Sequence, residues 1–68
     1  MNTSKERVMK ERAELGYKIG KLSNFLRRQK EKQTIPEKHL ELLIEQFATM
    51  KKYKFILDKR LEIWRKEK

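Results

Sequence analysis

Residues 40–64, LELLIEQFATMKKYKFILDKRLEIW, decide the fold. Apolar side chains recur in this stretch at alternating steps of three and four residues, which is typical of a helix that pairs with another helix. The repeat continues for more than three heptads and forms a seam at Leu40, Leu43, Phe47, Met50, Leu57, Leu61 and Trp64. Lys54 takes one further seam position, where we expect it to set the register or to reach an anion. We expect Trp64 to anchor the end of the seam.

A second set of apolar residues lies outside the seam of the same stretch. Its members are Leu42, Ile44, Tyr53, Phe55, Ile56 and Ile63. One partner helix cannot cover both sets, so the second set must be buried against something else. The sequence therefore predicts that the chain associates with copies of itself.

A first helix is predicted over residues 4–31. Thr3, with Glu6 three positions later, is typical of a capping box at a helix start. The apolar stripe that follows consists of Val8, Leu15, Ile19, Leu22 and Leu26. Gly16 and Gly20 interrupt this run and leave a shallow strip without side chains. We favour close helix packing as the reason for the two glycines over room for a ligand or for the backbone of a neighbouring subunit.

The connection between the two helices is short. Thr34 is predicted to cap the second helix, with Pro36 in its first turn and Glu37 completing another capping box. The turn then occupies residues 32–35 and the second helix residues 36–66. Because a short link between two long helices makes them antiparallel, we expect one all-α domain over residues 1–68. This domain is an antiparallel two-helix hairpin that assembles into a symmetric helical oligomer.

The size and composition of the chain also favour assembly. A chain of 68 residues buries only about 60% of its unfolded surface, so it needs disulfides, a metal or oligomerisation for stability. The sequence contains no cysteine, and its single histidine, His39, cannot form a zinc site alone. Oligomerisation is the remaining means of stabilisation.

The charge of the chain predicts an anionic partner. Lys and Arg total 19 and Asp and Glu total 10, which gives a net charge of +9 and a pI near 10.1. Antiparallel pairing brings the cations of residues 7–12 near those of residues 51–68. Tyr17 and Tyr53 lie in or beside these stretches, and cations with aromatic rings can bind phosphates and stack on bases. Composition alone supports a solubilising surface and a binding surface equally, with nucleic acid as the default partner.

Catalysis and membrane insertion find little support in the sequence. There is no Ser–His–Asp arrangement, cysteine nucleophile or glycine-rich phosphate loop. We interpret the ridge of Glu37, Glu41 and Glu45 as a solvated face rather than a metal site, and His39 as a surface or capping residue. No apolar run approaches the roughly 18 residues of a membrane span, and the N-terminus lacks the apolar core of a secretory signal. We therefore expect no enzymatic activity, metal, cofactor or membrane partner.

Two residue patterns, one in each predicted helix, match those of a known family. The first comprises Arg7-Val8, Glu11, Leu15, Lys18-Ile19, Lys21-Leu22 and Phe25-Leu26. The second comprises Leu42-Leu43, Gln46, Met50, Tyr53, Ile56-Leu57 and Arg60-Leu61, and is the more specific of the two. With these residues the chain resembles the small phage helical-hairpin domain found in anti-CBASS and anti-Thoeris proteins.

The resemblance implies that the protein is a sponge. Members of that family bind cyclic oligonucleotide second messengers made by bacterial immune enzymes and hold them without cleaving them. They form compact helical hexamers with ligand pockets at subunit junctions, where cyclic di- and trinucleotides occupy separate pockets. For this chain the resemblance implies a phage immune-evasion protein in the cytoplasm of the infected bacterial host. The alternatives are a small basic nucleic-acid-binding protein and a purely structural oligomerisation module.

The resemblance also implies which residues would bind the phosphates. Arg7, Lys18 and Lys21 of the first helix would contact them, and Glu11 would orient a cation or accept from a base edge. Arg60 is a further candidate in the second helix. Interface salt bridges are the alternative role for Arg7, Lys18 and Arg60.

Aromatic side chains would complete such a site. Relatives often place an aromatic residue close to the N-terminus, and nothing before Tyr17 is aromatic in this sequence. Base stacking would then fall to Tyr17, Phe25 or Tyr53. Of these, Tyr17 and Tyr53 join the candidate ligand-binding residues. The sequence leaves open which bases the ligand carries and how many subunits assemble.

Overall fold

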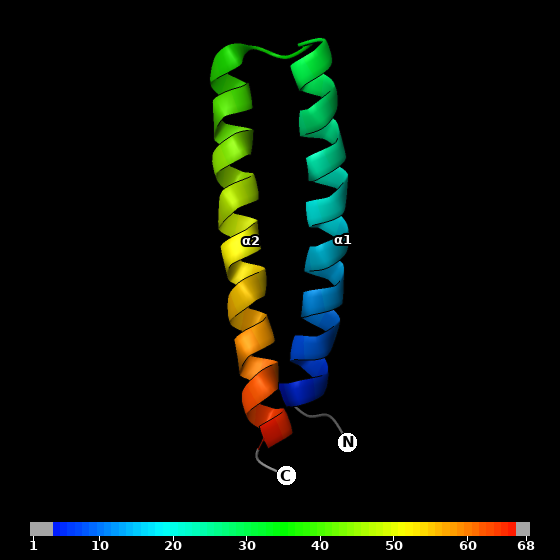
Figure 1. Ribbon diagram of the computed structural model, residues 1–68, viewed down its shortest axis with the longest axis vertical. Helices are drawn as coiled ribbons and strands as arrows, with labels where there is room; N and C mark the ends of the chain where they lie inside the picture. Colours follow the sequence, from blue (N-terminus) through cyan, green and yellow to red (C-terminus); the bar gives the residue numbers. More distant parts are fainter. Residues whose placement is uncertain (1–3, 67–68) are drawn as a thin grey trace.

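The computed structural model describes residues 4–66 and consists of two helices. Helix α1 spans Ser4–Glu31, helix α2 spans Glu37–Lys66, and residues 32–36 join them (Figure 1). The helices run antiparallel and lie side by side along almost their whole length, in a molecule of 49 × 17 × 15 Å. The start of α1 and the end of α2 meet at what we call the open end of the hairpin. The prediction of an all-α two-helix fold is confirmed.

The predicted seam of α2 faces α1. Leu57 is fully buried, with 0% of its surface exposed, and it packs with the buried side chains of Val8 and Leu15. The partly buried residues packed around this core are Ile19, Met50, Leu61 and Trp64. Every remaining seam position of α2, including Lys54, is half-buried. The period of three and four residues therefore identified the inward face correctly.

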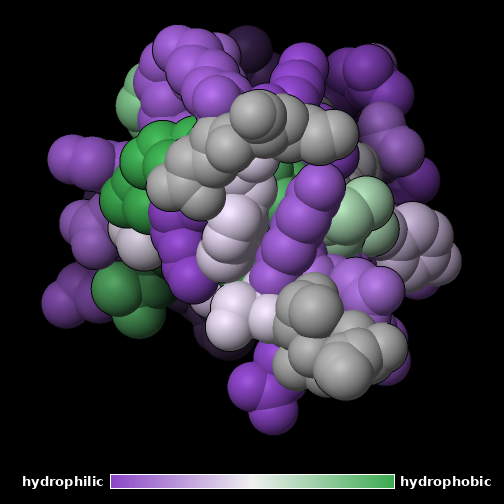
Figure 2. Space-filling view, turned by 90° about the horizontal axis from the view of Figure 1, so that it is seen from below, coloured by the Kyte–Doolittle hydropathy of each residue, from purple (hydrophilic) through white to green (hydrophobic). Residues whose placement is uncertain are grey.

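The second apolar set of α2 is exposed in the hairpin. Its six members range from 41% exposed at Tyr53 to 65% exposed at Leu42. Seen from the open end, hydrophobic residues reach the surface between hydrophilic ones (Figure 2). This confirms that α1 alone cannot cover both sets.

The turn is organised differently from the prediction. Gln29, only 6% exposed, donates from Nε2 to the Thr34 hydroxyl and accepts at Oε1 from the Thr34 backbone amide, both at 2.8 Å. The first backbone bond of α2 runs from the Leu40 amide to the Pro36 carbonyl at 2.9 Å, so α2 begins at Glu37. The expected cap at Thr34 is wrong, because α2 begins at Glu37 and Gln29 in the last turn of α1 engages the hydroxyl and the backbone amide of Thr34. The other predicted capping residue, Thr3, lies outside the described residues.

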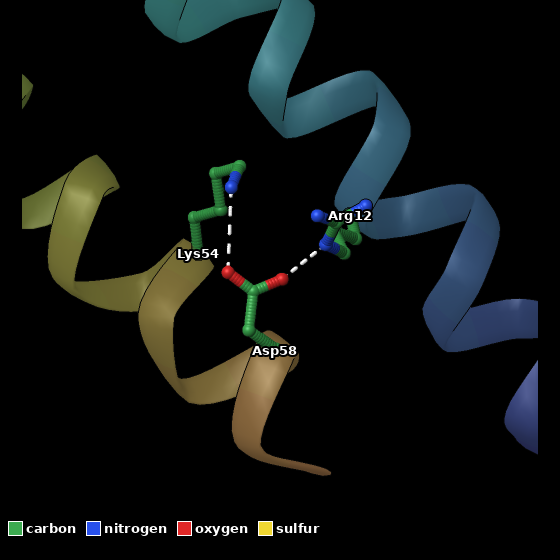
Figure 3. Close-up of polar contacts among 3 residues, drawn as sticks. All are labelled: Arg12, Lys54 and Asp58. Atoms are coloured by element: carbon green, nitrogen blue, oxygen red, sulfur yellow. Dashed lines mark hydrogen bonds and ion pairs between the residues drawn. The ribbon is translucent and has the colours of Figure 1, made fainter. Parts of the chain in front are cut away.

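Of the two roles expected for Lys54, the structure shows contact with an anion. Its Nζ donates to Oδ2 of Asp58 at 3.3 Å, and Oδ1 of the same carboxylate accepts from Arg12 of α1 (Figure 3). The anion is therefore the protein's own. The Lys54 stem passes Gly16, where an added Cβ would lie 3.6 Å from Cε, an ordinary contact. An added Cβ at Gly20 meets nothing within 4 Å, so close packing within the hairpin does not explain this glycine, which lies on the exposed side of α1.

Candidate anion-binding face

A groove at the open end brings together three of the predicted site residues. Arg7 and Glu11 of α1 and Arg60 of α2 line it together with Ser4 and Val8, and its volume is about 360 Å³. Arg7 and Arg60 are far apart in the sequence and meet only because the helices are antiparallel. Two guanidinium groups beside one carboxylate form a site that can bind an anion while Glu11 accepts a hydrogen bond.

Trp64 supports Arg60 in this groove. The Arg60 guanidinium lies over the Trp64 ring, 5.8 Å from its centroid, and the ring packs against the hydrophobic core. Such a cation–π contact restrains a long side chain that would otherwise be free in solvent. The sequence favoured the role of hydrophobic anchor for Trp64. The signal that this interpretation missed is the spacing of four residues between Arg60 and Trp64, which places both on one side of α2.

A second group of predicted residues lies further along α1. Tyr17 and Lys18 line a surface hollow of about 530 Å³ with Ala13 and Glu14. The ammonium group of Lys21 lies 5.2 Å from the Tyr17 ring centroid. Tyr17 is 67% exposed, so one side of its ring is available for stacking.

Tyr53 lies apart from both groups in a single chain. It lines a shallow hollow of about 520 Å³ on the outer side of α2, together with Ala48, Thr49, Lys52 and Ile56. No predicted residue of α1 contributes to this hollow.

Helical spacing nevertheless places most of the predicted residues on one face of the hairpin. Arg7, Glu11 and Lys18 follow each other at steps of four and seven, so they share one flank of α1. Tyr53 and Arg60 are seven residues apart and share one flank of α2. The open-end groove joins these two flanks. We call the surface formed by these five residues the cationic face.

The cationic face is too long to be one small-molecule site. Lys18 follows Arg7 by eleven residues, which is about 16 Å along the helix axis. Within one chain the predicted residues therefore form an open-end group, a Tyr17–Lys18–Lys21 group and an isolated Tyr53. One ligand can contact all of them only if it spans the face or if another copy of the chain contributes.

The opposite face of the hairpin is electrostatically different. A groove of about 440 Å³ there is lined by Arg12, Phe55, Asp58, Lys59, Leu61, Glu62 and Arg65. Both of its carboxylates are paired, since Asp58 accepts from Arg12 and from Lys54, and Nζ of Lys59 lies 3.5 Å from Oε1 of Glu62. The hydrogen bond from Arg12 is the main reason that the pKa of Asp58 lies below its ordinary value. This groove is less suited to a phosphate than the open-end groove, because its carboxylates already engage the nearby cations.

Residues 4–66 contain neither a metal-ion cluster nor a membrane span. No group of three or more His, Asp or Glu side chains is placed to hold a metal ion in this part of the chain. Neither described helix combines the length and the apolar character of a membrane span.

The sequence matches a family model, named Sequestin, over residues 2–63. The chain belongs to the Sequestin family. Searches of curated proteins and of solved structures gave no match. The match confirms the resemblance to the phage cyclic oligonucleotide sponges on which the site residues were chosen.

The Sequestin match covers all of α1 and α2 as far as Ile63, so it includes every predicted site residue. Membership of this family suggests a sequestering and non-enzymatic role.

Proposed function

We propose that this Sequestin-family hairpin binds cyclic di- or trinucleotide messengers and holds them without cleaving them, as a phage immune-evasion protein in the cytoplasm of the infected host. The observation that carries the proposal is the open-end groove, where Arg7 and Arg60 come together from two helices. The family match supports a sequestering role, and the net charge of +9 supports an anionic ligand.

The chemistry of the groove suits a cyclic nucleotide. Such a ligand carries two or three phosphodiester charges and flat bases. Arg7 and Arg60 offer planar, charge-assisted donors to phosphate oxygens, and the Glu11 carboxylate can accept from the edge of a base. Lys18 and Lys21 add cations further along the face, where Tyr17 offers a ring.

Self-association is part of the proposal. The open-end groove is a surface feature in one chain, and a thin hairpin encloses little of a ligand. A symmetric oligomer, which we propose to be a hexamer, buries the exposed apolar residues of α2 and creates pockets at subunit junctions. Sequestration then requires tight binding and no reacting groups.

Isothermal titration calorimetry against a panel of cyclic di- and trinucleotides at physiological salt tests the proposal. We expect submicromolar binding of at least one ligand, with fewer than one ligand per chain. Arg7→Ala and Arg60→Ala should each weaken binding about tenfold or more, because each removes a charge-assisted contact. Arg28→Ala, which removes an equal charge from an exposed position near the turn, is the matched control and should bind normally.

A second pair of substitutions tests the remainder of the face. Replacing Lys18 and Lys21 together by alanine should abolish messenger binding and leave the oligomer intact. Survival of binding in this double variant would show that the assignment of these lysines is wrong.

The alternative function is a small basic nucleic-acid-binding protein, which the net charge of +9 favours. Binding to duplex DNA neutralises many phosphates and therefore weakens steeply with salt, whereas a pocket with a few contacts responds weakly. No binding across the cyclic nucleotide panel, together with salt-sensitive binding of a short duplex, would replace the sponge by this alternative.

A further inference from the structure

The outer side of α2 carries a second heptad repeat, which we call the outer stripe. Leu42, Thr49, Ile56 and Ile63 follow each other at steps of seven. Gln46, Tyr53 and Arg60 alternate with them, so that the whole series advances by four and three residues in turn. This is the same period as the inward seam, displaced around the helix.

The outer stripe is accessible and apolar at its ends and centre. Leu42 and Ile63 at its ends, and Tyr53 and Ile56 at its centre, are all exposed in the hairpin. The central residues line a shallow hollow that a side chain from another helix can fill. A series of seven positions at heptad spacing extends for about 32 Å of helix and fits a helix better than any other partner.

We infer that the outer stripe packs against the outer stripe of a second copy in the antiparallel direction, with Tyr53 facing its own equivalent across a twofold axis. In this register Leu42 lies opposite Ile63 of the second copy, and Thr49 lies opposite Ile56. Each apolar end of the stripe then meets the other apolar end. The inference deepens the proposed self-association and does not depend on the ligand.

The charge of Arg60 decides between the two possible directions. A parallel pair places Arg60 directly against Arg60 of the second copy, where two like charges are costly. The antiparallel pair places Arg60 opposite Gln46 of the second copy, whose amide oxygen can accept a hydrogen bond from it.

One pair of flanking charges fits the same direction. Glu45 and Lys59 each precede a stripe position by one residue, on the outer edge of α2. In the antiparallel pair Glu45 lies beside Lys59 of the second copy, and the twofold axis produces this pair twice. Lys52, which precedes Tyr53, lies beside its own equivalent at the axis, so this single like-charge contact is outnumbered by the two opposite-charge pairs. In a parallel pair the offset of fourteen residues between Glu45 and Lys59 separates these opposite charges by about 21 Å.

This arrangement also completes the candidate site. Arg60 belongs to both the outer stripe and the open-end groove. The antiparallel register brings residues 42–46 of the second copy against Arg60, so the start of its α2 becomes an outer wall of the groove. Each pair then contains two equivalent grooves, one at each end, and the twofold contact can be repeated within a larger symmetric assembly.

Disulfide cross-linking tests the register directly, because the natural chain contains no cysteine. A mixture of Leu42→Cys and Ile63→Cys chains, mildly oxidised, should give a mixed disulfide dimer in high yield, since a disulfide forms only between close Cα atoms. Leu42→Cys alone should give little dimer. Ile44→Cys, two residues away and similarly exposed, is the matched control and should not cross-link to Ile63→Cys.

Two cross-linking results would contradict the antiparallel contact. Efficient cross-linking of Leu42→Cys with itself would overturn the antiparallel direction in favour of the parallel one. Equal yields for the Leu42→Cys and Ile44→Cys mixtures would show random collision and would overturn the inference.

A Tyr53→Cys chain tests the contact at the proposed twofold axis. It should cross-link with itself if the outer stripe is the contact, and a failure to do so while the chain is folded and self-associated would place the contact elsewhere. A chain that is monomeric by sedimentation would overturn the inference and the proposed oligomer together. Loss of messenger binding alone leaves the cross-linking pattern unchanged, so the failures of the two proposals are distinguishable.

Discussion

Single residues in this hairpin carry more than one role. Arg60 lines the open-end groove, lies over Trp64 and occupies the outer stripe. Trp64 closes the core from one side and restrains Arg60 from the other. Because Trp64 is the only tryptophan of the chain, its fluorescence reports on the environment of Arg60 without added labels.

Asp58 provides the cross-helix ion pair and is the basis of a pH prediction. Its pKa in the folded chain is lowered, first by the hydrogen bond from Arg12 and then by Lys54. A carboxylate with a lowered folded pKa stabilises the fold above its unfolded pKa of about 3.9, and this stabilisation is lost as the pH falls through the folded value. Asp58→Asn should therefore flatten the loss of thermal stability between pH 5 and pH 2, measured by circular dichroism.

Glu14→Gln, a carboxylate-to-amide change on α1, controls for the altered net charge in that experiment. If Asp58→Asn and the natural chain lose stability equally on acidification, the contact between Arg12 and Asp58 does not contribute in solution. The ion pair is exposed to solvent, so we expect a modest difference in stability at neutral pH.

The two helices differ in how much of their apolar surface the hairpin buries. In α1 the apolar stripe faces α2 and the remaining surface is mainly polar. In α2 the inward seam packs against α1, whereas the residues of the outer stripe are exposed to solvent. The imbalance between the two elements locates the expected subunit contact on α2.

Gly20 gives a prediction at the level of the helix. An added Cβ meets nothing within 4 Å there, so Gly20→Ala should stabilise the isolated hairpin by about 0.5–1 kcal/mol through helix propensity. The free energy of unfolding in urea measures this change. Ala13→Gly, at another exposed position of α1, is the reverse control and should destabilise by a similar amount. Destabilisation by Gly20→Ala would indicate that a neighbouring subunit approaches this glycine.

The whole molecule is a thin rod with a small core. Three apolar residues are buried among residues 4–66, and six large exposed apolar residues lie on α2 alone. A molecule of this shape gains stability by association, since burial of the exposed set adds to the core that one chain can form.

The dependence of thermal stability on protein concentration tests whether association stabilises the hairpin. If the folded state is the proposed hexamer, the thermal midpoint should rise by about 10–18 °C for a hundredfold increase in protein concentration, because association stabilises only the folded chains. Circular dichroism melts over that range measure the shift. A midpoint independent of concentration would mean that the hairpin is stable as a single chain.

The sequence by itself determined the two helices, their inward faces and the surplus of apolar surface on α2. These features depend on the helical period, and each is read from neighbours three, four or seven residues apart. Leu57 in the core and Leu42 at the surface were separated by this rule alone.

Only the tertiary structure decided which residues contact each other between the helices and at the turn. It joined Arg12 to Asp58 across 46 residues, gathered Arg7, Glu11 and Arg60 into one groove, and paired Gln29 with Thr34 in place of the expected cap. The physical reason is register. Contacts between antiparallel helices depend on how the turn closes and on which side chains fill the core, and neither is contained in the period of a single helix.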